Sequence, residues 1–342
     1  MRSWMSRPMV AAGLAAVSLV VSACASGKWT EAWIELGEGT PPAEIQLAVS
    51  RGSPDYDNLY PAVVLIGNRV IHPGAKVAAV TYCTGVLIES DLVLTAAHCL
   101  CAQAVENARF EASKNNDTAL KDKVIDREAC AKNTMVLKYT PTLTNSRSGF
   151  IQDSSSNFIE FPGVALLPEE FRMGIDGNGS ITSFRADLAV IRLNHEIKVP
   201  IAHKFPSRKL EQGENVLVVG FGSTVVNGKY FSAIRHFGTT KVTDIHLEEY
   251  KELPSTDEQH TEYASDKQNT AHIEEGDSGG PCFQEDESGE RWLVGIIHGK
   301  RPARGLKTVC ISTFHSQLVI DRLIRNARAV TMRKTLARPR SP

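Results

Sequence analysis

The chain has 342 residues, of which 42% are hydrophobic and 23% are charged, so it can bury a sizeable core and is not expected to be disordered. Its 38 basic and 39 acidic side chains give a formal net charge of −1. So balanced a charge creates no field that would attract nucleic acid, and nucleic acid is therefore not expected as a partner.

The first 23 residues have the layout of an export signal. Arg2 and Arg7 precede an apolar stretch, Met9–Val21, that contains no acid. At about 13 residues, this stretch is shorter than the roughly 20 that a membrane-spanning helix needs. The run Val21-Ser22-Ala23-Cys24 resembles the bacterial lipobox, which implies that Cys24 is acylated and tethers the protein to a membrane. The alternative is an ordinary signal followed by a chance cysteine. We expect an exported protein, either an envelope lipoprotein or one secreted after processing.

Residues 24–47 form a polar stretch that is interpreted as a tether or propeptide, and the folded body is expected over 48–330. Short apolar runs, rich in β-branched residues and bounded by turn residues, predict strands of a sandwich or barrel. These runs are Ala62–Ile66, Gly85–Ile88, Leu92–Leu94, Leu188–Ile191 and Val216–Val219.

The polar segments 102–183 and 244–270 are predicted to be long loops that carry short strands. A clear helical pattern occurs only near the end, at Leu318, Ile320, Leu323 and Ile324. The basic tail, 331–342, is expected to be solvated, with attraction to a membrane surface as the alternative.

The first chemical signal is Ser278, which lies in the glycine-rich run Gly276–Pro281. A serine hydroxyl needs a nearby base to act as a nucleophile, and it needs donors for the oxyanion that forms during acyl transfer. Glycines around the serine allow backbone amides to converge and leave room for a substrate carbonyl. Such a turn is a moderate signal when it stands alone.

Two further residues could complete such a site. His98 lies in Thr95–Cys99, just after the strand-like Leu92–Leu94, and Asp187 opens the buried run Leu188–Ile191. A lone histidine or aspartate in either place is more often structural than catalytic. The combination of all three segments, in this order, is far more specific than any one of them.

Together these segments resemble the trypsin-like (chymotrypsin-fold) serine peptidase family, in the family's chain order of His, Asp and Ser. Three further segments also resemble this family: Cys83–Ile88 before the histidine segment, Gly220-Phe221-Gly222, and Trp292–Ile297. The resemblance implies an all-β fold of two six-stranded antiparallel barrels, at about 48–198 and 210–312. A C-terminal helix is expected at about 313–329, and the active site between the barrels.

By this resemblance, Ser278 would attack a peptide carbonyl, His98 would accept and return its proton, and Asp187 would orient His98. The amides of Gly276 and Ser278 would form the oxyanion hole. The implied activity is that of a serine endopeptidase acting on protein or peptide substrates, with no metal and no other cofactor.

If Cys24 is acylated, six cysteines remain, an even number that suits an oxidising compartment but allows 15 pairings. The resemblance pairs Cys83 with Cys99. By elimination and proximity, Cys101 would then pair with Cys130, and Cys282 with Cys310. The alternative, a metal site at His98-Cys99-Leu100-Cys101, lacks a second Cys/His pair at zinc-site spacing.

The sequence departs from the family at the specificity pocket. Where cleavage after Arg or Lys requires an acid, this chain has His272, and His298 and Lys300 stand where serine and glycine are common. These three residues predict a preference for an acidic residue before the cleaved bond. The alternative is that they point to solvent or narrow the pocket.

The second departure concerns activation. Many relatives are cut before an Ile-Val-Gly-Gly start, whose new amino group pairs with the acid equivalent to Asp277, and that start is missing here. Either an activating protease cuts near Ala48–Ser50, which would also release the body from Cys24, or Asp277 has another partner.

Two other functions stay open. A catalytically silent binding module on the same fold is the main alternative, although such relatives usually lack part of the triad. An ester or lipid hydrolase would need a Gly-x-Ser-x-Gly elbow followed by Asp and His in that order, which this chain lacks.

Overall fold

In the computed structural model, the described residues all belong to one compact unit. The structure describes residues 45–46 and 53–330, apart from gaps at 73–74, 76–77, 116–122, 142–143, 147–148, 152–157, 177–180, 223, 227–228, 232–233, 249–257, 265–272, 274 and 302–306. The predictions for Cys24, for the tether before Ile45, for cleavage near Ala48–Ser50 and for the tail 331–342 fall outside the described residues.

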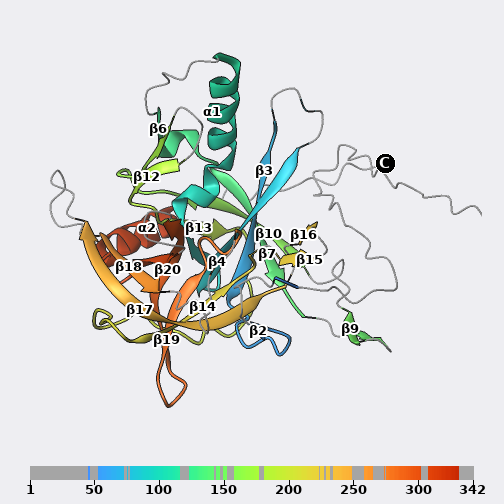
Figure 1. The fold of residues 1–342 in the computed structure, drawn as a ribbon, viewed down its shortest axis with the longest axis vertical. Coiled ribbons are helices and arrows are strands. Elements are labelled where there is room, and N and C mark those ends of the chain that lie inside the picture. The colour runs from blue at the N-terminus through green and yellow to red at the C-terminus, as the bar shows by residue number, and fades with distance from the viewer. Residues whose placement is uncertain are drawn as a thin grey trace, which may run out of the picture. The chain divides into compact units, whose positions relative to one another are not determined.

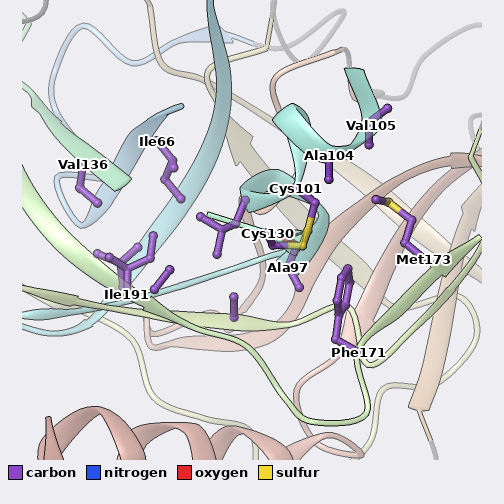
Figure 2. Close-up of a cluster of buried hydrophobic side chains, with 14 of the residues drawn as sticks. Ile66, Ala97, Cys101, Ala104, Val105, Cys130, Val136, Phe171, Met173 and Ile191 are labelled. Atoms are coloured by element: carbon purple, nitrogen blue, oxygen red, sulfur yellow. Dashed lines mark hydrogen bonds between the residues drawn. A yellow bond between two sulfur atoms is a disulfide. The ribbon is translucent and has the colours of Figure 1, made fainter. Parts of the chain in front are cut away.

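Six antiparallel strands close the first barrel in the order β10-β13-β5-β4-β3-β7. They are β3 (Val63–Val70), β4 (Ala79–Glu89), β5 (Leu92–Thr95), β7 (Asn133–Tyr139), β10 (Phe158–Leu166) and β13 (Ala189–Leu193). Inward-facing β-branched side chains fill the barrel, as expected for alternating strands. Figure 2 shows Ile66, Val136 and Ile191 in this core, which also contains the aromatic ring of Phe171.

Six further strands form the second barrel in the order β14-β19-β20-β21-β18-β17, and pairing of β17 with β14 closes it. They are β14 (Asn215–Gly220), β17 (His236–Glu248), β18 (Glu258–Ala264), β19 (Pro281–Glu285), β20 (Arg291–Arg301) and β21 (Lys307–Ser312). The core of this barrel includes Val216, Val218 and Ile297. The expected architecture of two six-stranded antiparallel barrels is confirmed.

Each barrel is contacted by a short segment from the opposite end of the chain (Figure 1). Before the first barrel begins, β2 (Ser53–Pro54) pairs with β17 of the second barrel. After the second barrel ends, α2 (Gln317–Ala329) packs against β13 and β10 of the first. The buried face of α2 consists of Val319, Ile320, Leu323 and Ala327, which recur at helical spacing. The predicted C-terminal helix is thus present.

A third apolar cluster joins the two barrels. It includes Leu94 from β5, Val219 and Phe283 from the second barrel, and Ile320 from α2, each almost completely buried. Because burial of apolar surface is the main force that holds packed layers together, this shared cluster fixes the interface along which the candidate site lies.

The remaining strands are short. β1 (Ile45–Gln46), β15 (Thr224–Val226) and β16 (Lys229–Phe231) form one small sheet, and β8 (Thr144–Ser146) pairs with β9 (Gly149–Ile151). A further sheet contains β6 (Lys123–Asp126), β11 (Arg172–Ile175) and β12 (Ile181–Arg185). Two short 3-10 helices are η1 (Ala97–Leu100) and η2 (Arg127–Ala129).

One element differs from the sequence prediction. Residues expected to begin a long loop form a helix, α1 (Ala102–Asn115), which packs against β3 and β6. Among its side chains that the structure describes, the buried ones are Ala104, Val105 and Ala108, which are small. Alanine favours helix but adds little to a hydrophobic pattern, so the periodic signal was weak.

Three disulfides join Cys83 to Cys99, Cys101 to Cys130, and Cys282 to Cys310. These are the pairs that the resemblance, elimination and proximity had predicted. Figure 2 shows the Cys101–Cys130 bridge within the first core, near the start of α1. Such bridges indicate an exported protein, because they persist in oxidising compartments. Within the described ranges, no helix is both long and apolar enough to cross a membrane.

Candidate active site

His98 and Asp187 lie in direct contact at the centre of the candidate site. Nδ1 of His98 is 2.7 Å from Oδ2 of Asp187, and the backbone N–H of His98 donates to Oδ1 of the same carboxylate at 2.7 Å. Asp187 is fully buried, whereas the side chain of His98 keeps 14% of its surface exposed. Two bonds to one carboxylate fix both the ring and the backbone of His98.

Local backbone structure explains how these two residues meet. Strand β5 ends at Thr95, and His98 lies in η1 immediately after it. Asp187 precedes β13, which pairs with β5 along its length. Ala186 has a φ of 52°, in the left-handed region that non-glycine residues seldom adopt. This turn directs the carboxylate of the next residue inward, so a strained backbone position adjoins the site.

The carboxyl group of Asp187 is ionised at neutral pH. Burial raises its pKa, but attraction to the His98 ring in its protonated form, together with the hydrogen bonds from His298 and His98, outweighs burial and holds the pKa well below its ordinary value. An ionised carboxylate can only accept hydrogen bonds. Nδ1 of His98 must therefore carry the proton, and Nε2 of the neutral ring is left as an acceptor.

The turn that carries Ser278 is held between the two barrels. The carbonyl of Ser278 accepts from the amide of Thr84 in the first barrel at 2.8 Å, and Oγ1 of Thr84 donates to the carbonyl of Gly276 at 2.8 Å. On the other side, the amide of Gly279 donates to the carbonyl of Ile297 in β20 at 2.7 Å. Gly276 and Gly279 have φ values of 100° and 81°, which favour glycine.

Ser278 reaches this network through its backbone. Among the residues that the structure describes, neither its hydroxyl nor its amide forms a hydrogen bond, and the amide of Gly276 also donates none. Sγ of Cys99 contacts both Nε2 of His98, at 3.9 Å, and the carbonyl of Ser278, at 3.5 Å. The sequence-predicted serine thus lies beside the His98 segment with its hydroxyl and nearby amides available.

Asp277 is fully buried. Its carboxylate was predicted to pair either with a new amino group, formed by cleavage, or with another partner. The amide of Gly222 donates to its Oδ1 at 2.7 Å. A Cβ atom at Gly222 would lie 2.5 Å from Oδ2 of Asp277, and one at Gly220 would lie 2.1 Å from Oδ1. The Gly220-Phe221-Gly222 turn therefore closes around this carboxylate, and only glycine fits at its two ends.

His298, predicted to line the substrate pocket, contacts Asp187. Its Nδ1 is 2.6 Å from Oδ2 of Asp187, and only 7% of its side chain is exposed. The rings of His98 and His298 meet edge to face, with centroids 5.7 Å apart, and Phe184 contacts both. Sequence reasoning missed the contact between His298 and Asp187 because 111 positions separate these two residues in the chain.

The other two predicted pocket residues are not brought into this cluster by the described structure. His272 lies outside the described residues. Lys300 belongs to β20 by its backbone, and its side chain is outside the described part of the chain.

The cluster of His98, Asp187 and His298 contains residue types that also bind zinc. Its geometry is that of hydrogen bonding instead. With zinc bonds of about 2.0 to 2.1 Å, two ligand atoms of a tetrahedral site would lie about 3.3 Å apart. Here each Nδ1 lies 2.6 to 2.7 Å from Oδ2 of Asp187.

A two-barrel fold with a buried His–Asp pair beside a glycine-rich serine turn defines a chymotrypsin-like protein. The chain belongs to the trypsin-like peptidase domain family, whose model matches residues 83–296. Two mutants of human heparin binding protein are similar solved structures, at 16% and 17% identity and TM-scores of 0.48 and 0.46. Each comparison covers 81% of this chain and 96% of the other. No curated protein sequence gives a significant match.

Proposed function

We propose that this protein is a serine endopeptidase that works through an acyl-enzyme, with Ser278 as nucleophile, His98 as general base and acid, and Asp187 as the residue that orients His98. The observation that carries the proposal is the doubly bonded His98–Asp187 pair, which leaves Nε2 of His98 as a proton acceptor. The family match supports a peptide or protein substrate.

In the proposed reaction, the oxygen of Ser278 attacks the substrate carbonyl and its proton passes to Nε2 of His98. The developing imidazolium is stabilised by the ionised Asp187. The amides of Gly276 and Ser278 donate to the oxyanion, a role for which their lack of partners in the described structure leaves them available. The proton on His98 then goes to the leaving amine, and a water molecule hydrolyses the acyl-enzyme by the same route.

The close contact of His98 with Ser278 is expected to form when substrate binds. Catalytic hydrogen bonds are often long in the free enzyme and tighten in the substrate complex. The contacts of Cys99 with both residues keep them near one another meanwhile.

Ordering of the serine turn is proposed to rest on Asp277 and its bond from Gly222. This bond forms within the uncut polypeptide, so cleavage near Ala48–Ser50 would not be needed to give the carboxylate of Asp277 a hydrogen-bond donor. Amino-terminal sequencing of the active enzyme tests the idea. A single start near Ala48–Ser50 in all active molecules would instead support an activating protease.

For specificity, an acidic residue before the cleaved bond stays a proposal that rests on His272 and Lys300, because His298 is engaged by Asp187. A peptide library that varies this residue provides the test. Preference for Arg, Lys or large apolar residues would contradict the proposal.

A fluorophosphonate probe tests the proposed activity most directly, because an activated serine oxygen attacks its phosphorus, displaces fluoride and becomes phosphonylated. We expect the wild type and a Ser288→Ala control to be labelled, since Ser288 lies in an exposed turn. Ser278→Ala should not be labelled. A folded wild-type protein that stays unlabelled would favour the binding-module alternative.

A further inference from the structure

The carboxylate of Asp187 binds two histidines rather than one. Both His98 and His298 approach the same oxygen, Oδ2, through Nδ1, at 2.7 and 2.6 Å, while Oδ1 accepts the amide of His98. Because Asp187 is ionised and buried, both Nδ1 atoms must carry protons. Each ring is therefore fixed in the same tautomer by one shared acceptor.

The backbone around His298 brings its side chain to Asp187. The pairing of β20 with β21 shifts register between Ile297 and Gly299, which is where His298 lies. Such bulges turn one side chain out of the regular alternation and are common beside active sites. Gly299 has a φ of 153°, which accommodates the irregular step.

The same strand also holds the serine turn. The carbonyl of Ile297 accepts from the amide of Gly279, and its amide donates to the carbonyl of Gly280, both at 2.7 Å. Ile297 and His298 are consecutive, so one point on β20 binds the turn after Ser278 and the carboxylate of Asp187. Asp187 comes from the first barrel, and β20 belongs to the second.

We propose that His298 is a positioning residue that ties Asp187 to β20, the strand that hydrogen-bonds the serine turn, and so keeps the acid, the base and the nucleophile in register across the barrel interface. This inference rests on the proposed function. His298 does not touch substrate or take the serine proton. Its N–H replaces water as a donor to a buried carboxylate, and it prevents Oδ2 from turning away from His98.

Two nearly isosteric variants separate the hydrogen bond from the space that the side chain fills. His298→Asn offers an amide N–H close to the place of Nδ1–H, whereas His298→Leu offers none. Loss of a hydrogen bond to a charged group corresponds to about a 10- to 100-fold lower rate of fluorophosphonate labelling in the leucine variant. The asparagine variant should recover most of the rate. Equal rates in the wild type and a folded leucine variant would overturn the proposal.

Proton NMR of the free protein tests the geometry without any need for activity. The wild type should show two low-field N–H signals that disappear in Asp187→Ala, one from each histidine. His298→Asn should retain only the signal of His98. A wild-type spectrum in which His298 contributes no such signal would overturn the proposal even if the leucine variant failed to fold. Two signals in a protein that the probe does not label would contradict the proposed function while leaving the hydrogen-bonding geometry in place.

Discussion

Arg235 and Asp55 form an ion pair from which solvent is fully excluded, although 180 positions separate them in the chain. Nε of Arg235 donates to Oδ2 of Asp55 at 2.7 Å, and Nη1 donates to the carbonyl of Val63 at 3.1 Å. Asp55 also accepts the amides of Leu59 and Tyr60. The pair thus joins the segment before the first barrel to the start of β17.

Replacement of Arg235 by methionine should therefore destabilise the protein strongly, because it leaves the charge of Asp55 buried without its cation. We expect the free energy of unfolding, measured in urea, to fall by about 3 kcal/mol or more. Arg208→Met is the control, since Arg208 pairs with Glu214 at the surface and should contribute no more than about 1 kcal/mol. Equal effects of the two variants would contradict a stabilising role for the buried pair.

The orientation of His98 predicts the effect of Asp187→Asn. An amide can present an N–H to the ring, which favours the tautomer with the proton on Nε2 and removes the acceptor for the serine proton. In the proposed mechanism, the rate of fluorophosphonate labelling should fall by about 10⁴-fold at neutral pH, with little change in the fold. A loss of less than tenfold would show that Asp187 does not set the tautomer.

The close packing around Asp277 predicts a different kind of loss for Gly222→Ala. The added Cβ would lie 2.5 Å from Oδ2 of Asp277, so the carboxylate must move and the serine turn with it. We expect strongly reduced labelling of Ser278 even where the protein remains folded by circular dichroism. Gly67→Ala is the matched buried control, since its nearest neighbours would be at an ordinary 3.7 Å. Normal labelling of the Gly222 variant would mean that Asp277 need not stay in place.

The lowered pKa of His203 predicts that the protein loses stability in acid. Burial is the main cause that lowers its pKa from 6.5 to about 4, and the charge of Arg291 adds to the effect. The unfolded chain therefore takes up a proton at a pH where the folded protein does not. This contribution to stability is complete above pH 6.5 and is lost as the pH falls toward 4.

The loss from this one group should reach up to about 3 kcal/mol in the free energy of unfolding. Urea unfolding at pH 7 and at pH 4.5 should show a smaller decline for His203→Gln than for the wild type. An unchanged pH dependence in His203→Gln would contradict the assignment.

Local sequence patterns were sufficient to predict most of the architecture. β-Branched runs such as Val216–Val219 located strands, and the cysteine pairs were correctly predicted. His98 and Asp187 were expected to meet, and they do. In these cases, the signal lies within a few neighbouring residues or in the chain order of the three motifs.

The features that were missed depend on long-range contacts or on weak periodicity. Helix α1 buries mainly alanine, so its pattern did not stand out. Nothing near Arg235 in the sequence reveals its distant partner, Asp55. His298 was noticed for standing in place of a serine, but its direction depends on a bulge in β20 that pairing with another strand creates.

The exchange of terminal segments between the barrels means that neither half is a self-sufficient folding unit. A break between β13 and β14 would deprive the first half of the helix that covers β13, and it would leave the second half with Arg235 buried opposite no carboxylate. Each half would recover its missing piece only by binding the other. The His98–Asp187 pair and the Ser278 turn, contributed by different halves, can therefore be assembled only when the two halves fold against each other.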